Sequence, residues 1–232
     1  MLLLALDTST VACSAALLRE ETILADEELP MIRGHAEALL PMVARIMAQA
    51  GVPFREIDRL AVTIGPGHFT GLRAGIAAAR GLALALDRPL VGITTLEAVA
   101  AGVPEAERRG RILIVAIDSK REEAYLQAFD ERLAACASPE ALQPAAYAAR
   151  FAAKRPAASV LLAGDGAGAL GGAFAALGIG FMRATGSGHA SAAVVARLAA
   201  SRPVPAMAPR PLYLHPAETK PAALRPAPVA AS

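Results

Sequence analysis

A glycine-rich turn contains the residues whose types and spacing are best suited to bind an anion. Gly65-Pro66-Gly67-His68-Phe69-Thr70-Gly71-Leu72-Arg73 follows an apolar run at 60–64, a predicted buried strand, and precedes a helix expected over 72–86. A strand, a glycine turn and a helix N-terminus together present backbone N–H groups to an anion. Gly65 and Gly67 allow φ values that a Cβ forbids, Thr70 is expected as the N-cap, and Arg73 lies in the first turn.

The spacing of these glycines differs from two common phosphate-binding motifs. No Lys-Ser or Lys-Thr pair follows the second glycine, so the turn is not a Walker A loop. Gly65-x-Gly67-x-x-x-Gly71 has one residue too many for a dinucleotide-binding fingerprint. The alternative interpretation is a turn that only joins a strand to a helix.

Asp7 ends the predicted first strand and precedes Thr8 and Ser9. In a nucleotide-binding fold this position places a carboxylate near a phosphate or its metal, whereas in a hairpin it caps the turn. Asp118 has the same two interpretations. The residues expected to contact a nucleotide or phosphate, if this chain binds one, are Asp7, Ser9, Gly65, Pro66, Gly67, Thr70 and Arg73.

The histidines and cysteines do not form a metal-binding pattern in the sequence. No two of His35, His68, His189 and His215 are three to five residues apart, which is the spacing of a local zinc pair. Cys13 and Cys136 are far apart, as free thiols of a cytosolic protein would be. We therefore expect no metal site and no catalytic residue.

The composition is that of a cytoplasmic α/β protein without a membrane segment. The 232 residues carry a net charge of +2, and their 55% hydrophobic content comes largely from alanine. No run of about 18 uncharged apolar residues is present, and Asp7 interrupts the apolar start, which predicts a first strand and not a signal peptide. The near-neutral charge argues against a broad nucleic-acid surface but leaves RNA contact within a larger complex open.

The apolar pattern predicts two lobes of similar topology. Strands are expected at 2–6, 12–18, 22–28, 60–64 and 89–93, with helices at 35–50, 72–86 and from 95. After a charged linker at 102–111 the pattern restarts with strands at 112–117, 123–129 and 159–163, a glycine turn at 164–168 and a helix at 189–200. We expect lobes at 1–104 and 105–188, with the last helix packing back on the first lobe and a disordered tail at 216–232.

Two helices of the first lobe have surfaces suited to helix packing. The helix at 35–50 has an apolar face that by default packs on its own sheet, and Gly51 ends it. The helix at 72–86 carries little side-chain bulk, which favours close approach by another helix, from this chain or from a partner.

Five motifs in this order resemble the bacterial TsaB (YeaZ) family, over about residues 1–215. They are Leu4-Ala5-Leu6-Asp7-Thr8-Ser9-Thr10, His35-Ala36-Glu37-x-Leu39-Leu40-Pro41, Gly65-Pro66-Gly67-x-Phe69-Thr70-Gly71-Leu72-Arg73-x-Gly75, Ile117-Asp118-Ser119-Lys120-Arg121 and Tyr213-Leu214. The resemblance implies the two-lobed fold of actin, Hsp70 and the acetate and sugar kinases (ASKHA), here with a reduced second lobe. It also implies kinship with TsaD, which transfers threonylcarbamoyl to adenosine in tRNAs that read ANN codons.

The resemblance implies a partner role and no catalysis by this chain. TsaD carries a His-x-x-x-His metal pair, and Thr95 and Val99 stand at the matching positions here. The implied partners are TsaD as a heterodimer, the ATPase TsaE, tRNA through the complex, and a second copy when the chain is alone. ATP or ADP is expected in or near the complex, with no intrinsic cofactor. The implied interface residues are Leu39, Leu40, Val43, Ile46, Met47, Leu72, Ala74, Ala78, Ala79 and Ala83.

Three positions depart from the family pattern. His68 replaces the usual Ser, Ser119-Lys120 replaces Ala-Arg, and His215 replaces the Arg that follows Tyr-Leu. One alternative function is a phosphotransferase or ATPase of the same fold, in which Asp7 and the glycine turn handle phosphate. The other is a metallopeptidase, against which the missing histidine pair argues.

Overall fold

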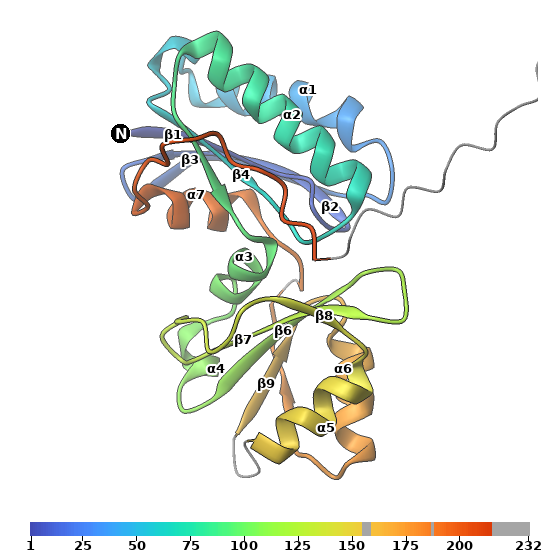
Figure 1. The fold of residues 1–232 in the computed structure, drawn as a ribbon. Coiled ribbons are helices and arrows are strands. Elements are labelled where there is room, and N and C mark those ends of the chain that lie inside the picture. Colours follow the sequence, from blue (N-terminus) through green and yellow to red (C-terminus); the bar gives the residue numbers. More distant parts are fainter. Residues whose placement is uncertain (155–158, 187, 215–232) are drawn as a thin grey trace, which may run out of the picture.

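The computed structural model describes residues 1–154, 159–186 and 188–214, which form two lobes, each built on one five-stranded sheet (Figure 1). The tail predicted at 216–232 and His215 lie outside the described residues. The first sheet has the strand order β3-β2-β1-β4-β5. Its strands are β1 (Leu2–Asp7), β2 (Ala12–Arg19), β3 (Thr22–Pro30), β4 (Arg59–Thr63) and β5 (Leu90–Ile93).

The second sheet repeats the pairing of the first. Its order is β10-β9-β6-β7-β8, and its strands are β6 (Ile112–Asp118), β7 (Ala124–Phe129), β8 (Glu140–Leu142), β9 (Val160–Ala163) and β10 (Met182–Arg183). In each lobe the first strand pairs antiparallel with its hairpin partner and parallel with the strand that follows the first helix. This shared topology confirms the predicted internal repeat.

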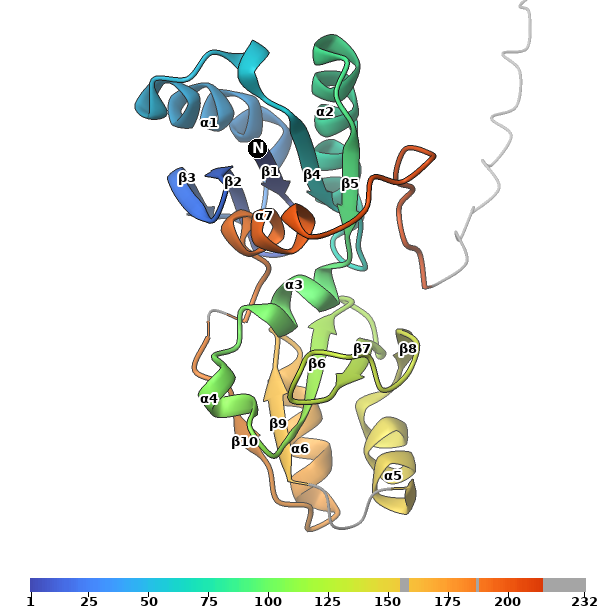
Figure 2. The same cartoon turned by 90° about the vertical axis from the view of Figure 1, so that its left-hand side faces the viewer.

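Helices cover both faces of each sheet, and the last helix of each repeat packs on the opposite lobe (Figure 2). Helices α1 (His35–Ala50) and α2 (Phe69–Leu86) cover the outer face of the first sheet, and α7 (Ala192–Ala200) covers its inner face. Helices α5 (Pro144–Lys154) and α6 (Ala167–Ala176) cover the outer face of the second sheet, while α3 (Thr95–Ala101) packs on β6.

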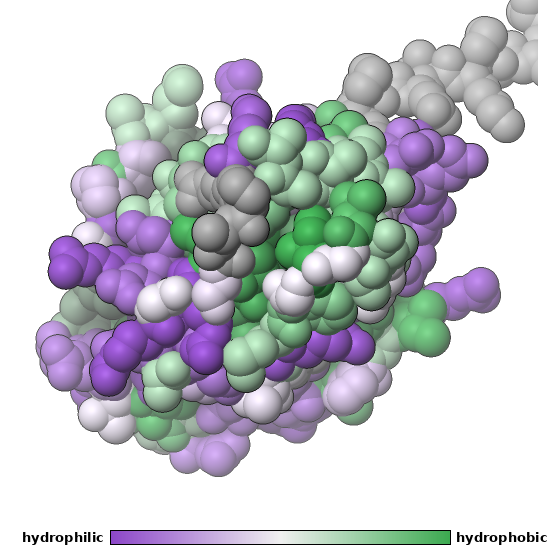
Figure 3. Space-filling view, turned by 90° about the horizontal axis from the view of Figure 1, so that it is seen from below, coloured by the Kyte–Doolittle hydropathy of each residue, from purple (hydrophilic) through white to green (hydrophobic). Residues whose placement is uncertain are grey.

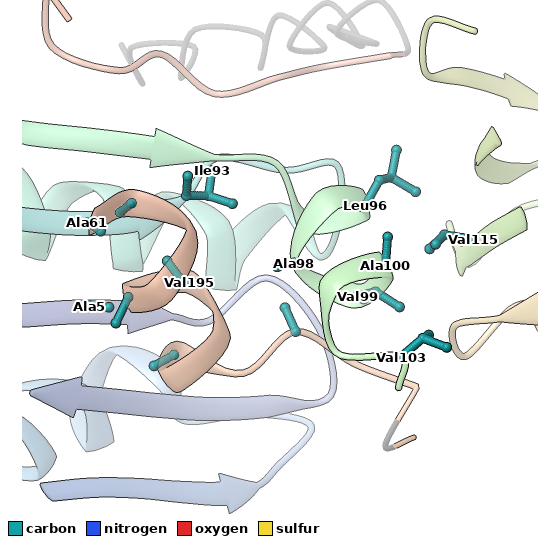
Figure 4. Packing of buried hydrophobic residues seen from close by; sticks show 14 of the residues in the cluster. Ala5, Ala61, Ile93, Leu96, Ala98, Val99, Ala100, Val103, Val115 and Val195 are labelled. Atoms are coloured by element: carbon teal, nitrogen blue, oxygen red, sulfur yellow. The ribbon is translucent and has the colours of Figure 1, made fainter. Parts of the chain in front are cut away.

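One continuous apolar cluster joins the two lobes (Figure 4). It combines small side chains of the first sheet with residues of α3, α7 and β6; examples are Ala5, Ala61, Ile93, Leu96, Val99, Val195 and Val115. Arg202 at the end of α7 also contacts Glu97 of α3, with 2.5 Å between Nη2 and Oε1. Because this cluster excludes water between the lobes, burial of its apolar surface favours one fixed lobe arrangement.

Several element boundaries differ from the sequence expectation. Helix α2 begins at Phe69 with His68 as its N-cap, so the expectation that Thr70 caps it is wrong. The charged segment predicted as a linker contains the short helix α4 (Glu105–Arg108). The second glycine turn ends earlier than expected because α6 begins at Ala167, and the last helix begins at Ala192 instead of 189. A 3-10 turn (Phe54–Glu56), β8, β10, α5 and α6 were not predicted.

The segment at 203–214, here called the C-terminal strap, runs along the β5 side of the first lobe and reaches the start of α2 (Figure 2). The Leu212 N–H donates to the carbonyl of Ile64 at 2.7 Å, and Arg80 of α2 donates to the carbonyl of Pro209 at 2.5 Å. Gly92 of β5 permits the approach, since a Cβ there would lie 2.8 Å from Pro209. The strap therefore covers an edge strand, whose unpaired backbone groups would otherwise invite pairing with other chains.

Seen from below, the end of the second lobe carries mixed side chains, with hydrophobic residues near the middle of the view and hydrophilic ones around them (Figure 3). Leu177 and Met182 of this lobe are 51% and 52% exposed. Scattered apolar side chains of this kind are normal for a protein surface and indicate no binding site by themselves.

Candidate functional site

The glycine turn is pressed against the turn that joins β1 and β2. A Cβ on Gly67 would lie 2.1 Å from the carbonyl oxygen of Ser9, and a Cβ on Gly71 would lie 2.2 Å from that of Thr8. A Cβ on Gly75 would lie 2.2 Å from Thr8 Oγ1. These glycines are therefore required by close packing of two chain segments, which the sequence alone did not reveal.

Hydrogen bonds hold the same contact. Thr8 Oγ1 donates to the carbonyl of Gly71 at 2.7 Å, and the His68 N–H donates to the carbonyl of Ser9 at 2.8 Å. The Gly65 carbonyl accepts from the N–H of Thr95, at 2.8 Å, at the start of α3. Gly65 has a φ of 103°, and the Gly65–Pro66 bond is cis. The polar groups of the turn thus join β1, α2 and α3.

Asp7 lies at the centre of this contact and is fully buried. Its Oδ1 accepts from Ser9 Oγ at 2.6 Å, from the Ser9 N–H at 3.1 Å and from Thr63 Oγ1 at 2.5 Å. Its Oδ2 has no hydrogen-bond partner among the described residues. Burial raises the pKa of the Asp7 carboxyl, and the hydrogen bonds from Ser9 and Thr63 only partly oppose that shift.

The raised pKa of Asp7 predicts that the ionised carboxylate lowers the stability of the folded chain. Between 3.8, the ordinary pKa of Asp, and the raised pKa in the folded chain, the folded state binds more protons than the unfolded state, so stability falls as pH rises. We expect Asp7→Asn to raise the thermal midpoint at pH 7 and the gain to shrink as pH is lowered toward 4. Thermal unfolding of the variant between pH 4 and 7 tests this, with Asp26→Asn, at an exposed position of β3, as the control. An unchanged or lower midpoint of Asp7→Asn at pH 7 would contradict the prediction.

The structure separates the seven residues expected to contact phosphate. Asp7, Ser9 and Gly65 are buried in the contact just described. Pro66, Gly67, Thr70 and Arg73 line an open groove instead. This basic groove is bounded by residues 32–37, the first turn of α2, the β6–β7 turn at 119–121 with Tyr125, and the end of the strap at 212–214, and it encloses about 1130 Å³.

Asp118 acts as a turn cap in the second lobe. Its Oδ1 accepts from the Lys120 N–H at 2.7 Å, and its Oδ2 pairs with Lys120 Nζ at 2.8 Å. The hydrogen bond from Lys120 lowers the pKa of the Asp118 carboxyl. The Asp118 N–H itself donates to Asp165 Oδ1 at 2.8 Å. Of the two interpretations of Asp118, the geometry favours the structural one.

A small cavity lies between the lobes beside Asp165 and His189 and encloses about 180 Å³. His189 Nε2 lies 2.8 Å from Glu28 Oε1, which ties this side of the cavity to β3 of the first lobe. Sites for small organic ligands usually measure about 300 to 1,000 Å³. This cavity is below that range.

The two positions that match the metal pair of TsaD are buried. Thr95 is 0% exposed and Val99 is 3% exposed, and Val99 belongs to the cluster that joins the lobes. Among residues 1–154, 159–186 and 188–214, no group of three or more His, Cys, Asp or Glu side chains is arranged to hold a metal ion.

Six of the ten residues predicted for the partner interface are buried within the chain. They pack on the outer face of the first sheet because an amphipathic helix buries its apolar stripe against its own sheet first. The buried six are Leu39, Val43, Ile46, Met47, Leu72 and Ala79. Leu40 is 49% exposed, and Ala74, Ala78 and Ala83 are half-buried.

The outer face of α2 is apolar and largely exposed. Ala77, Gly81 and Ala85 are exposed, and Leu84 is 85% exposed. By length and composition α2 could cross a membrane, with 28% of the helix buried. Its inner stripe, however, packs on the sheet as in the core helix of a globular domain. Leu84 and Ala77 are not among the residues predicted for the partner interface, although they lie away from the buried stripe of Leu72, Ile76 and Ala79.

Comparison with known proteins places this architecture in a family. The family model for TsaD, tRNA N6-adenosine threonylcarbamoyltransferase, matches residues 22–215. A solved structure from Pseudomonas aeruginosa, described as an uncharacterized protein with similarity to peptidase YeaZ, superposes with a TM-score of 0.74 and is 31% identical. The alignment covers 92% of this chain and 99% of that one. The chain belongs to the TsaB (YeaZ) family.

Curated TsaB proteins match a shorter part of the chain. The "tRNA threonylcarbamoyladenosine biosynthesis protein TsaB" of Escherichia coli (strain K12) is 42% identical over 125 residues, which cover 54% of this chain and 53% of that protein. The protein of the same name from Haemophilus influenzae is 42% identical over 123 residues. The chain thus spans about half the length of the curated relatives it matches. The predicted two-lobed α/β fold, with one five-stranded sheet in each lobe, is confirmed for this TsaB-family chain.

Proposed function

We infer that this TsaB-family chain is a non-catalytic partner subunit in the synthesis of N6-threonylcarbamoyladenosine in tRNA. In this role it binds TsaD through the outer face of α2, and the pair then engages the ATPase TsaE. The names of the curated relatives support the pathway. The expected cellular location of this role is the cytoplasm.

The outer face of α2 is the observation that carries this proposal. An exposed strip with Ala77, Gly81 and Leu84 carries small or apolar side chains, and the exposed Arg80 borders it. Small residues let another helix approach closely, and the exposed Leu84 offers an apolar anchor at one end. The half-buried Ala74 and Ala78 lie on the same helix, and Leu40 of α1 is 49% exposed. A second copy of the chain is expected to use this surface when TsaD is absent.

The interior of the chain supports a role without catalysis of its own. The positions of Thr95 and Val99 are buried and carry no imidazole, and the cavity between the lobes encloses only about 180 Å³. The apolar cluster that joins the lobes also leaves little freedom for a cleft to open and close around a substrate. Nucleotide is expected in or near the assembled complex.

Reconstitution of the modification tests the proposal directly. Cognate TsaD, TsaE and the synthase that makes threonylcarbamoyl-AMP are combined with tRNA, with and without this chain. We expect N6-threonylcarbamoyladenosine to form only when the chain is present. Equal modification without it would contradict the partner role.

A charge on the outer face of α2 is expected to weaken the binding of TsaD to this chain. Ala77→Glu adds a long, charged side chain to a strip of small residues, and burying it against a partner should weaken TsaD binding by about 100-fold. Ala175→Glu on the exposed side of α6 serves as the matched control, because it adds the same charge to an exposed alanine of another helix. Calorimetric titration with TsaD measures both variants; equal affinity for the two would rule out this face.

The rival function, a phosphotransferase or ATPase of the same fold, requires a nucleotide site in this chain alone. Titration of the isolated chain with ATP and ADP, combined with a hydrolysis assay, discriminates between the two. Micromolar binding with turnover in the isolated chain would favour the rival and would require the buried Asp7 to become accessible.

A further inference from the structure

The basic groove collects positive charge from three parts of the chain. Arg33 precedes α1, Arg73 lies in the first turn of α2, and Lys120 and Arg121 come from the β6–β7 turn of the second lobe. Glu37 is the carboxylate that lines the groove with them. Lys120 pairs with Asp118, but its side chain remains 58% exposed. The described lining of the groove is therefore complementary to a polyanion.

Two long helices begin at this groove, and neither begins with a side-chain cap. Helix α1 has 16 residues and follows Gly34, whereas α2 has 18 residues and follows His68. Gly34 has no side chain to cap α1, and the His68 side chain accepts no hydrogen bond from the backbone N–H groups in the first turn of α2. Uncapped N–H groups and the helix dipoles place two positive helix ends along one side of the groove.

Two histidines of the groove provide an independent indication of a ligand. His35 is 6% exposed, and its ring lies against the first turn of α2, near Gly71. Neither His35 Nε2 nor His68 Nε2 has a hydrogen-bond partner among the described residues, although both atoms are buried. Buried polar atoms are nearly always hydrogen-bonded in folded proteins, so two such nitrogens in the lining of one groove point to a bound group that hydrogen-bonds to them, as acceptor or donor according to the tautomer.

Aromatic side chains add a stacking surface to the basic groove. Phe69 and Tyr213 are 51% and 45% exposed, and their ring centroids lie 5.7 Å apart. The Arg73 guanidinium lies 3.7 Å from the centroid of the Phe69 ring and donates from Nε to Tyr213 Oη at 3.1 Å. Tyr125 lines the groove from the second lobe. Exposed rings beside basic side chains are the features with which proteins bind the unpaired bases of single-stranded nucleic acids.

We propose that the basic groove binds a single-stranded segment of RNA. The phosphates lie along the two helix N-termini and the basic side chains, and a base stacks on Phe69 and Tyr213. The groove is open, runs from the first lobe to the second, and at about 1130 Å³ exceeds the usual size of a small-ligand pocket of about 300 to 1,000 Å³. The inference rests on the proposed function, because that function brings an RNA substrate to this chain.

Fluorescence anisotropy of the full chain with a labelled single-stranded RNA of about 12 nucleotides tests this proposal. We expect saturable binding that weakens steeply as salt is raised from about 50 to 200 mM. Arg33→Glu should weaken binding by about tenfold and reduce the salt slope by about one, and Phe69→Ala should weaken it at every salt concentration. Arg132→Glu, an exposed position of the second lobe outside the groove, is the control for net charge and should weaken binding less.

Three results would overturn the proposal. They are no RNA binding at low salt, equal loss of binding in Arg33→Glu and Arg132→Glu, and binding of ADP or polyglutamate as tight as that of the RNA under the same conditions. Association with TsaD, measured in the absence of RNA, separates this failure from failure of the proposed function. A chain that binds TsaD but no RNA retains the partner role and loses only the RNA groove.

Discussion

Replacing Gly71 by alanine is expected to destabilise the first lobe severely. The added Cβ would lie 2.2 Å from the carbonyl oxygen of Thr8, which belongs to the backbone and cannot move like a flexible side chain. Either α2 or the β1–β2 turn must shift, which also breaks the hydrogen bond from Thr8 Oγ1 to Gly71. We expect a loss of about 3 kcal/mol of unfolding free energy, the upper end of the usual overpacking cost. Denaturant unfolding measures it, and the thermal midpoint should fall by about 6 to 12 °C.

Gly172 in α6 provides the matched control for this experiment. It is also a helical glycine, but a Cβ there meets nothing within 4 Å, and it lies away from the proposed partner surface. Gly172→Ala is expected to stabilise the chain by up to about 1 kcal/mol through helix propensity. If both substitutions changed the unfolding free energy in the same direction and by similar amounts, close packing would not be the reason for glycine at 71.

A charge at Val43 is expected to unfold the chain, although the sequence suggested this residue as part of a partner surface. Val43 is 1% exposed and packs in the cluster between α1 and the first sheet. Val43→Asp would place an unpaired carboxylate among apolar side chains, at a cost of about 4 kcal/mol or more. Circular dichroism with urea denaturation checks this, and we expect loss of cooperative folding or a much lower midpoint.

The neighbouring position Leu40 separates folding from binding on the same helix. Leu40 is 49% exposed, so Leu40→Asp should change the unfolding free energy by less than about 1 kcal/mol. Because Leu40 is an exposed apolar residue among those predicted for the partner interface, the same substitution should weaken TsaD binding. A stable Val43→Asp protein that failed to bind TsaD would instead support the original assignment of Val43 to the partner interface.

The sequence by itself determined most of the strands and the repeated arrangement of the two lobes. Short apolar runs such as Leu2–Asp7 and Ile112–Asp118 favour buried strands, and Gly51 ends α1 in the left-handed conformation that the sequence predicts. The family motifs also identified the fold, because their residues and order are specific. Helix α6 was not predicted because its own residues are apolar or glycine on every face, so its sequence shows no 3.6-residue period.

Only the tertiary structure decided which faces of the helices are buried and why the glycines are needed. Periodicity shows that α1 and α2 have apolar stripes, but the space available on the sheet decides that Val43 and Ile76 are covered while Leu84 is exposed. Likewise, Gly71 resembles part of an anion-binding turn until Thr8, 63 residues away in sequence, is seen to fill the space of its missing side chain. Contacts between segments this distant depend on how the whole chain folds, so no local pattern of residues encodes them.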